Sequence, residues 1–197
     1  MFFDTHAHLD DPTFDADRAE VIQRAVDAGV DTMVAVGTTA ASSQICVELA
    51  REFTPLVAAV GIQPNCAVEA GPDAWDRIVR LSEQPEVVAL GETGLDRHWD
   101  FTPFDVQQDF FRRHLELAAE RRLPVVVHTR NCDEEMLDML RCHSADGPIR
   151  GVMHSFTGGP EMAAECVAMG LSISFAGMVT FKKSESLRQC AATIPDD

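Results

Sequence analysis

The residues of this 197-residue chain best suited to chemistry are four histidines and one glutamate, each in a short motif within or after an apolar run. They occur in "FFDTHAHLDD", "ALGETGLD", "VVVHTR" and "GVMHSF", as His6, His8, Glu92, His128 and His154. Alternate side chains of a strand share a face, so Asp4, His6 and His8 are expected to point the same way. Imidazoles and carboxylates on one face form either a hydrogen-bonded polar patch or part of a metal site.

The joint pattern favours the metal site. If each apolar run is a strand, all five side chains lie at strand ends and meet at one rim. The other three histidines, His98, His114 and His143, fall in a loop, a long helix and a helix end. Unpartnered buried polar groups are costly, and two divalent cations with Glu92 between them would satisfy this set. Imidazole-rich ligation favours zinc, manganese is compatible and magnesium is less suited, so the expected cofactors are two divalent ions, Zn, Mn or Mg.

Seven short apolar runs alternate with amphipathic helical stretches along the chain. The runs cover 1–9, 31–39, 56–64, 87–96, 123–130, 150–158 and 171–179. Near-continuous Val, Ala and Ile are typical of parallel strands buried on both faces. The stretches between them, such as "FDADRAEVIQRAVDAG" and "FDVQQDFFRRHLELAAERRLP", carry apolar residues at helical spacing and end at Gly29 or before Pro124.

Seven successive strand–helix units predict an α/β fold, either a doubly wound open sheet or a TIM-type (β/α)8 barrel. The dinucleotide fingerprint G-x-G-x-x-G is absent, and the polar motifs lie at the carboxyl ends of several strands, where such barrels keep their active sites. The barrel is therefore the better prediction. Only seven units are visible, so residues 1–197 are expected to form a single, incomplete barrel domain.

The composition limits the classes of binding partner and the cellular compartment that we expect for this chain. The net charge is −16 and Lys182 and Lys183 are the only lysines, which excludes a basic nucleic-acid-binding surface. It leaves room for an enzyme that holds nucleic acid through metal ions in a cleft. The sequence shows no secretory signal and no apolar run of membrane-spanning length, and its six cysteines form no C-x-x-C pair. We expect reduced thiols, a cytoplasmic location and no membrane contact.

The motifs "DTHAHLD", "GETGLD", "VVVHTR" and "HSFTG", in this order, resemble those of the TatD-type metal-dependent deoxyribonucleases, a branch of the amidohydrolase-like barrel enzymes. The resemblance covers the entire chain. It implies a two-metal site in which one ion is held by His6, His8 and Glu92, and the other by Glu92, His128 and His154. It also implies phosphodiester hydrolysis of DNA by metal-activated water. Because the chain is acidic, single-stranded nucleic acid or its 3' ends are the expected substrate.

The chain departs from the family pattern at two places. Family members usually carry an aspartate in an E-T-D-type motif at the end of the eighth strand, where it binds the first metal and can accept a proton. Nothing here matches it, and the terminal Asp196 and Asp197 are not in that context, so no catalytic residue is assigned. The family's G-x-H-P-H segment is replaced by "GIQPN". Gln63 and Asn65 can hydrogen-bond a phosphate oxygen but cannot carry a proton.

Three further positions could contact substrate or support the ligands. Arg130 is the candidate phosphate-binding residue because of its fork of donors, although a surface or helix-start salt bridge is the alternative. In the loop after Glu92, Trp99 or Phe101 could stack on a base, whereas packing of the tryptophan over the rim is the simpler expectation. Asp96 could orient a ligand from behind or cap this loop.

Two rival functions stay open at the level of sequence. The same barrel and metals could cleave an ester or amide, such as an aminoacyl ester on tRNA or a small cyclic amide. Alternatively, the chain could be a truncated, catalytically silent barrel that binds metal weakly or serves as a partner protein.

Overall fold

Seven parallel strands form one curled sheet in the computed structural model, which describes residues 2–145 and 147–195. Each strand pairs with the next in chain order, without a reversal. The strands are β1 (Phe2–Ala7), β2 (Val30–Val36), β3 (Leu56–Val60), β4 (Val87–Asp96), β5 (Val125–Arg130), β6 (Gly151–Met153) and β7 (Leu171–Ile173). A doubly wound sheet reverses its strand order at a switch point, so this continuous order confirms the TIM-type barrel prediction.

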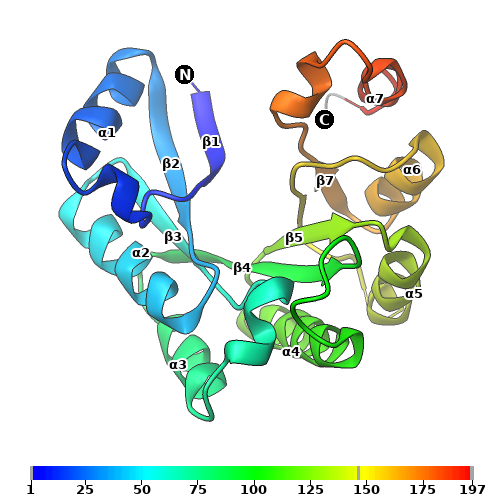
Figure 1. The fold of residues 1–197 in the computed structure, drawn as a ribbon, viewed down its shortest axis with the longest axis horizontal. Coiled ribbons are helices and arrows are strands. Elements are labelled where there is room, and N and C mark those ends of the chain that lie inside the picture. Colours follow the sequence, from blue (N-terminus) through cyan, green and yellow to red (C-terminus); the bar gives the residue numbers. More distant parts are fainter. Residues whose placement is uncertain (1, 146, 196–197) are drawn as a thin grey trace.

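Helices cover the outer side of the curled sheet, and the arc is open between β1 and β7 (Figure 1). Within the described residues these two strands do not pair, so seven units of the barrel are present, as expected. The α-helices are α1 (Arg18–Asp27), α2 (Ala40–Glu52), α3 (Ala74–Leu81), α4 (Phe104–Arg121), α5 (Asp133–Ser144), α6 (Pro160–Ala168) and α7 (Glu185–Ala191). Short 3-10 turns are η1 (Pro12–Phe14), η2 (Pro64–Glu69) and η3 (Gly177–Thr180). None of the described helices is long and apolar enough to cross a membrane.

The strands are apolar on both faces because each face packs against apolar side chains. On the outer face, fully buried residues such as Phe111 of α4 and Met136 of α5 join the largest core cluster. On the inner face, Val34, Val36 and Val126 belong to a second, smaller cluster. This two-sided burial produces the near-continuous apolar runs seen in the sequence.

Several strands differ in length from the apolar runs that predicted them. The pairing of β6 with β7 extends over only three residues of each strand, and the apolar residues after Ile173 lead instead into η3. In contrast, β4 covers the whole of its predicted run, 87–96, and includes Glu92. The two motif glycines permit this, because a Cβ at Gly91 or Gly94 would lie 2.6 Å or 2.0 Å from a backbone oxygen of β5. Glu92 therefore lies within a strand, not at a turn.

Candidate metal centre

The structure brings all five predicted donor residues together at the carboxyl-end rim of the sheet. His6 lies near the end of β1 and His8 one residue beyond it, whereas His154 directly follows β6. Glu92 comes from β4 and His128 from β5. Their ligand atoms form two groups of three, in each of which all atoms lie within 4.8 Å of one another and to which Glu92 is common.

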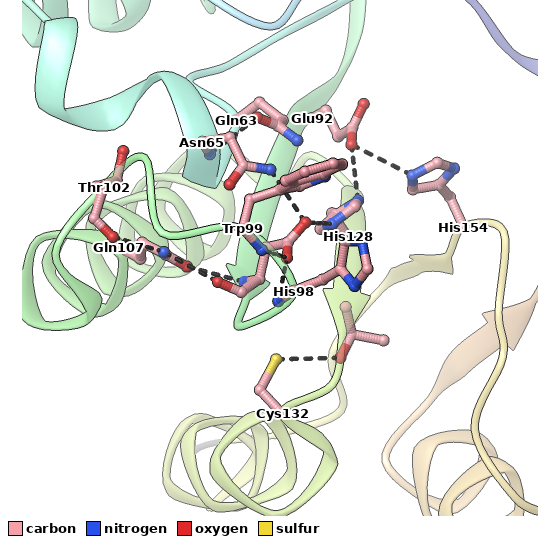
Figure 2. A network of polar contacts seen from close by, with 12 residues as sticks. Gln63, Asn65, Glu92, His98, Trp99, Thr102, Gln107, His128, Cys132 and His154 are labelled. Atoms are coloured by element: carbon pink, nitrogen blue, oxygen red, sulfur yellow. Dashed lines mark hydrogen bonds and ion pairs between the residues drawn. The ribbon is translucent and has the colours of Figure 1, made fainter.

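The buried carboxylate of Glu92 stands between two pairs of imidazoles. Its Oε2 lies 3.4 Å from Nε2 of His6 and 3.5 Å from Nε2 of His8. Its Oε1 lies 3.0 Å from Nδ1 of His128 and 3.3 Å from Nε2 of His154. Figure 2 shows the second pair converging on Glu92 from β5 and from the segment after β6. Each carboxylate oxygen thus has its own pair of nitrogen donors.

These contacts fit metal ligation better than a closed hydrogen-bond network. Nε2 of His154 is buried and makes no hydrogen bond with any residue that the structure describes, although it lies 3.3 Å from Oε1 of Glu92. The Nε2 atoms of His6 and His8 face each other at 3.2 Å. Nitrogen donors about 2.1 Å from a shared tetrahedral ion are separated by about 3.4 Å, so the observed spacings of 3.0–3.5 Å suit zinc-like ions in both groups.

Electrostatics at the rim favour a cation between the carboxylates. Burial by itself raises the pKa of Glu92, but the surrounding imidazoles hold that pKa well below its ordinary value. Burial lowers the pKa of His128, yet contacts with Asp96 and Glu92 raise it to about 9. The site therefore carries concentrated negative charge that a proton or a metal ion would neutralise.

Asp96 contacts a donor histidine and also caps a loop, so the contacts that both roles considered for it require are present. Its Oδ2 accepts hydrogen bonds from Nε2 of His128 at 2.9 Å and from Nδ2 of Asn65 at 3.0 Å. Its Oδ1 accepts from the backbone N–H groups of His98 and Trp99, at 2.7 and 3.2 Å. Burial raises the pKa of Asp96, but these donors lower it to about 2. A carboxylate behind a ligating histidine fixes the orientation of the ring and increases its basicity.

Two further residues support this network, and the sequence did not indicate these roles for them. Asn65 had been considered for phosphate binding, but its amide N–H group is bonded to Asp96. Gln107 of α4 accepts from the backbone N–H of Asp96 at 2.8 Å and donates to the Asp96 and Thr102 carbonyls at 3.1 and 3.0 Å (Figure 2). A glutamine on an otherwise amphipathic helix gives no sequence signal for such a contact.

On the β1 side the support is thinner. Nδ1 of His8 lies 2.9 Å from the Val36 carbonyl, and Nδ1 of His6 is buried without a partner in the part of the chain that the structure describes. Asp4, which alternation placed on the same face as these histidines, contacts the backbone. Its Oδ1 accepts from the His6 backbone N–H at 3.0 Å, and it belongs to neither donor group. The pairing of β1 shifts register between Asp4 and Ala7, which breaks the regular alternation.

The remaining residues singled out in the sequence differ in where they lie. Arg130 is the last residue of β5, is exposed and forms no ion pair with the described residues, so the salt-bridge alternative is not found. His114 and His143 lie in α4 and α5, away from the donor groups, as expected. Asp196 and Asp197 fall outside the described residues.

Fold and donor set together define a TIM-type barrel of the metal-dependent hydrolase class. The family model described as "TatD related DNase" matches residues 3–197, and the chain belongs to this family. It is 39% identical to the "Uncharacterized metal-dependent hydrolase YabD" of Bacillus subtilis, over 100% of this chain and 77% of that protein. It is 34% identical to the "3'-5' ssDNA/RNA exonuclease TatD" of Salmonella typhimurium, over 98% of this chain and 74% of that protein.

A solved structure shows the same fold. The crystal structure of YJJV, a TatD homologue from Escherichia coli, superposes with a TM-score of 0.91 at 32% identity. The match covers 98% of this chain and 75% of that one. The chain thus spans about three quarters of each of these three relatives.

Proposed function

We propose that this chain hydrolyses phosphodiester bonds of single-stranded DNA or RNA, acting at 3' ends, with two divalent ions held at the carboxyl-end rim. The observation that carries the proposal is the Glu92 carboxylate, each oxygen of which faces its own pair of imidazole nitrogens. Such an arrangement would let Glu92 contribute one oxygen to each of two ions. The substrate class follows the relatives named as 3'-5' ssDNA/RNA exonucleases.

The proposed ligand sets are His6, His8 and Glu92 for one ion, and Glu92, His128 and His154 for the other. Bound there, Zn, Mn or Mg would lower the pKa of a water molecule and polarise phosphoryl oxygens. In this proposal Asp96 holds the His128 ring and Arg130 binds a phosphate of the substrate. No side chain of the described residues is assigned as the proton acceptor.

Two broader features belong to the same proposal. One continuous sheet runs from β1 to β7, which supports treating 1–197 as a single barrel domain, without its eighth unit. All six cysteines are free, and four of them are buried, which supports a cytoplasmic location.

A substrate panel tests the function. The protein is loaded with Zn²⁺, Mn²⁺ or Mg²⁺ and given 5'-labelled single-stranded DNA, RNA and duplex DNA, together with an aminoacyl-tRNA and a cyclic amide. We expect stepwise shortening of the single strands from the 3' end. Turnover of the ester or amide without strand cleavage would replace the nuclease by the rival hydrolase. Stoichiometric metal binding with no turnover of any substrate would support the alternative of a catalytically silent barrel.

Glu92→Ala is the loss-of-site variant in this panel, and Glu134→Ala is its matched control. Glu134 is an exposed glutamate in the first turn of α5 and takes part in neither donor group. Cleavage that persists in the Glu92 variant would come from a contaminating nuclease, whereas cleavage lost only there belongs to this site.

A further inference from the structure

A pair of stacked aromatic rings faces solvent in the loop between β4 and α4. The Trp99 and Phe101 rings lie 5.3 Å apart between centroids with an interplanar angle of 8°. Their residues are 45% and 58% exposed. Burying two large rings would stabilise the fold, and these two are left in contact with water. Packing of the core therefore does not account for their position.

The pair is fixed to the candidate metal centre through one carboxylate. The backbone N–H of Trp99 donates to Oδ1 of Asp96 at 3.2 Å, and Nε2 of His128 donates to Oδ2 of the same side chain at 2.9 Å. The other end of the loop is held where Gln107 donates to the Thr102 carbonyl at 3.0 Å (Figure 2). The rings are therefore held close to a proposed metal ligand by a buried network.

A cation without an acidic partner accompanies the rings. The guanidinium carbon of Arg130 lies 5.9 Å from the Trp99 ring centroid, within cation–π range, and Arg130 pairs with no carboxylate of the described residues. Arg97, in the same loop, differs: its Nε lies 2.8 Å from Glu135 and its guanidinium carbon 3.7 Å from the Phe104 centroid. On a chain with a net charge of −16, an unpaired arginine beside an exposed aromatic pair suits a ligand with both an aromatic ring and a negative charge.

We propose that Trp99 and Phe101 form a stacking site for one base of a nucleic acid strand and that Arg130 binds the adjacent phosphate. This inference rests on the proposed function, since it supplies the substrate contact of that same site. Every base offers a π-face, so the site accepts all four bases. In a duplex both faces of an internal base are covered by its neighbours, so stacking here selects single strands.

Steady-state kinetics on the metal-loaded protein test the stacking contact. Trp99→Ala should raise KM for a single-stranded oligonucleotide about 10-fold and change kcat less than about 2-fold, because it removes binding and not chemistry. Trp99→Phe keeps a ring and should recover most of this loss. Phe2→Ala is the matched control. Phe2 is an exposed ring at the amino end of β1, whereas the donor residues lie at the carboxyl ends of the strands, so this variant should leave KM unchanged.

Abasic substrates locate the contact on the strand. One abasic residue is placed in turn at each of several positions from the 3' end. A single position should raise KM about 10-fold with the wild-type chain and have no further effect with Trp99→Ala, because both changes remove the same stack. Equal effects of the abasic residue in the two proteins would overturn the stacking site.

Fluorescence separates this inference from the proposed function. The chain has two tryptophans, so Trp75→Phe leaves Trp99 as the sole emitter. A hydrolysis-resistant phosphorothioate oligonucleotide should quench it, whereas an abasic strand should not. Quenching without cleavage of any substrate supports the stacking site and overturns the nuclease. Cleavage with neither quenching nor a KM change in Trp99→Ala overturns the stacking site alone, and absence of both quenching and cleavage overturns both.

Discussion

The histidines on the two sides of Glu92 are held in contrasting ways. His128 lies in an interior strand, its side chain is 17% exposed, and its second nitrogen is bonded to a carboxylate that accepts three further hydrogen bonds. His8 lies beyond the end of edge strand β1, is 44% exposed at its side chain, and has only the Val36 carbonyl behind its second nitrogen. His6 has no partner for its second nitrogen at all among the described residues.

The contrast shows that similar donor spacings can rest on very different supports. Ligand atoms on both sides are about 3–3.5 Å from Glu92, yet the β4–β5 side has a charged carboxylate behind His128, whereas the β1 side has one backbone carbonyl behind His8. Such outer-layer partners are worth roughly 10–100-fold in metal affinity. We therefore expect the ion at His128 and His154 to bind more tightly than the ion at His6 and His8.

Removing the residue that both sides share should have the largest effect. Glu92→Ala deletes one ligand from each proposed set, so we expect both ions to be lost after dialysis. Activity should fall by more than the roughly 100-fold that loss of an outer-layer partner can cost. Elemental analysis of the variant and of wild type provides the measurement. Retention of one ion per chain would show that one side binds without Glu92, and circular dichroism checks that the variant is folded.

How much of this contrast the sequence predicts depends on distance along the chain. Strand ends of a parallel barrel meet at one rim whatever the loops do, so His6, His8, Glu92, His128 and His154 could be grouped from their motifs alone. Asp96 could be named as a candidate support because it follows Glu92 in the same motif, but its other partners could not be predicted. The bond from Asn65 to Asp96 joins residues 31 positions apart, and its existence depends on the path of η2.

Two features of β1 and β4 depend on local contacts that a single sequence does not contain. The alternation rule placed Asp4 with the donors, but it assumes regular pairing, which the register shift in β1 interrupts. Glycines beside Glu92 are compatible with a turn as well as with the predicted strand, because glycine is typical of both turns and close backbone contacts. Only the approach of β5 to Gly91 and Gly94 decides for the strand, and a single sequence does not contain that distance.

Acid should destabilise the fold, because a buried neutral histidine of α4 accepts a hydrogen bond from the backbone after β3. Nε2 of His114 accepts the Ile62 N–H at 3.1 Å, and burial lowers the pKa of His114 to about 4. Unfolded chains bind this proton near pH 6.5 while the folded chain does not, so the stability is present above pH 6.5 and is lost as pH falls toward 4. The shift is equivalent to about 3 kcal/mol.

Urea unfolding at pH 7, 5.5 and 4 measures this effect against a non-titrating variant. His114→Gln keeps a hydrogen-bond acceptor for Ile62 and should be less stable than wild type at pH 7. Between pH 6.5 and 4 it should lose about 3 kcal/mol less than wild type, because carboxylates and the rim histidines titrate alike in both proteins. Parallel pH dependences of the two chains would exclude His114 as a source of acid lability.

Two aspartates, each bonded beside a donor histidine, give the finest test of the contrast. Asp96→Asn removes the charge behind His128 and leaves an amide that cannot accept every bond that Asp96 accepts, so affinity for the ion on that side should fall about 10–100-fold. Asp4→Asn alters only an exposed contact to the His6 backbone and should change affinity less than about 3-fold. Competition titration of each variant with a fluorescent chelator gives the dissociation constant of the metal ion for each.

Because Asp96 also fixes the loop through His98 and Trp99, the Asp96 variant should raise KM for single strands as well, whereas the Asp4 variant should not. Equal losses of metal affinity in the two variants would mean that the hydrogen-bond network around Asp96 adds nothing to metal binding. The structural contrast between the two sides of Glu92 would then have no effect on affinity.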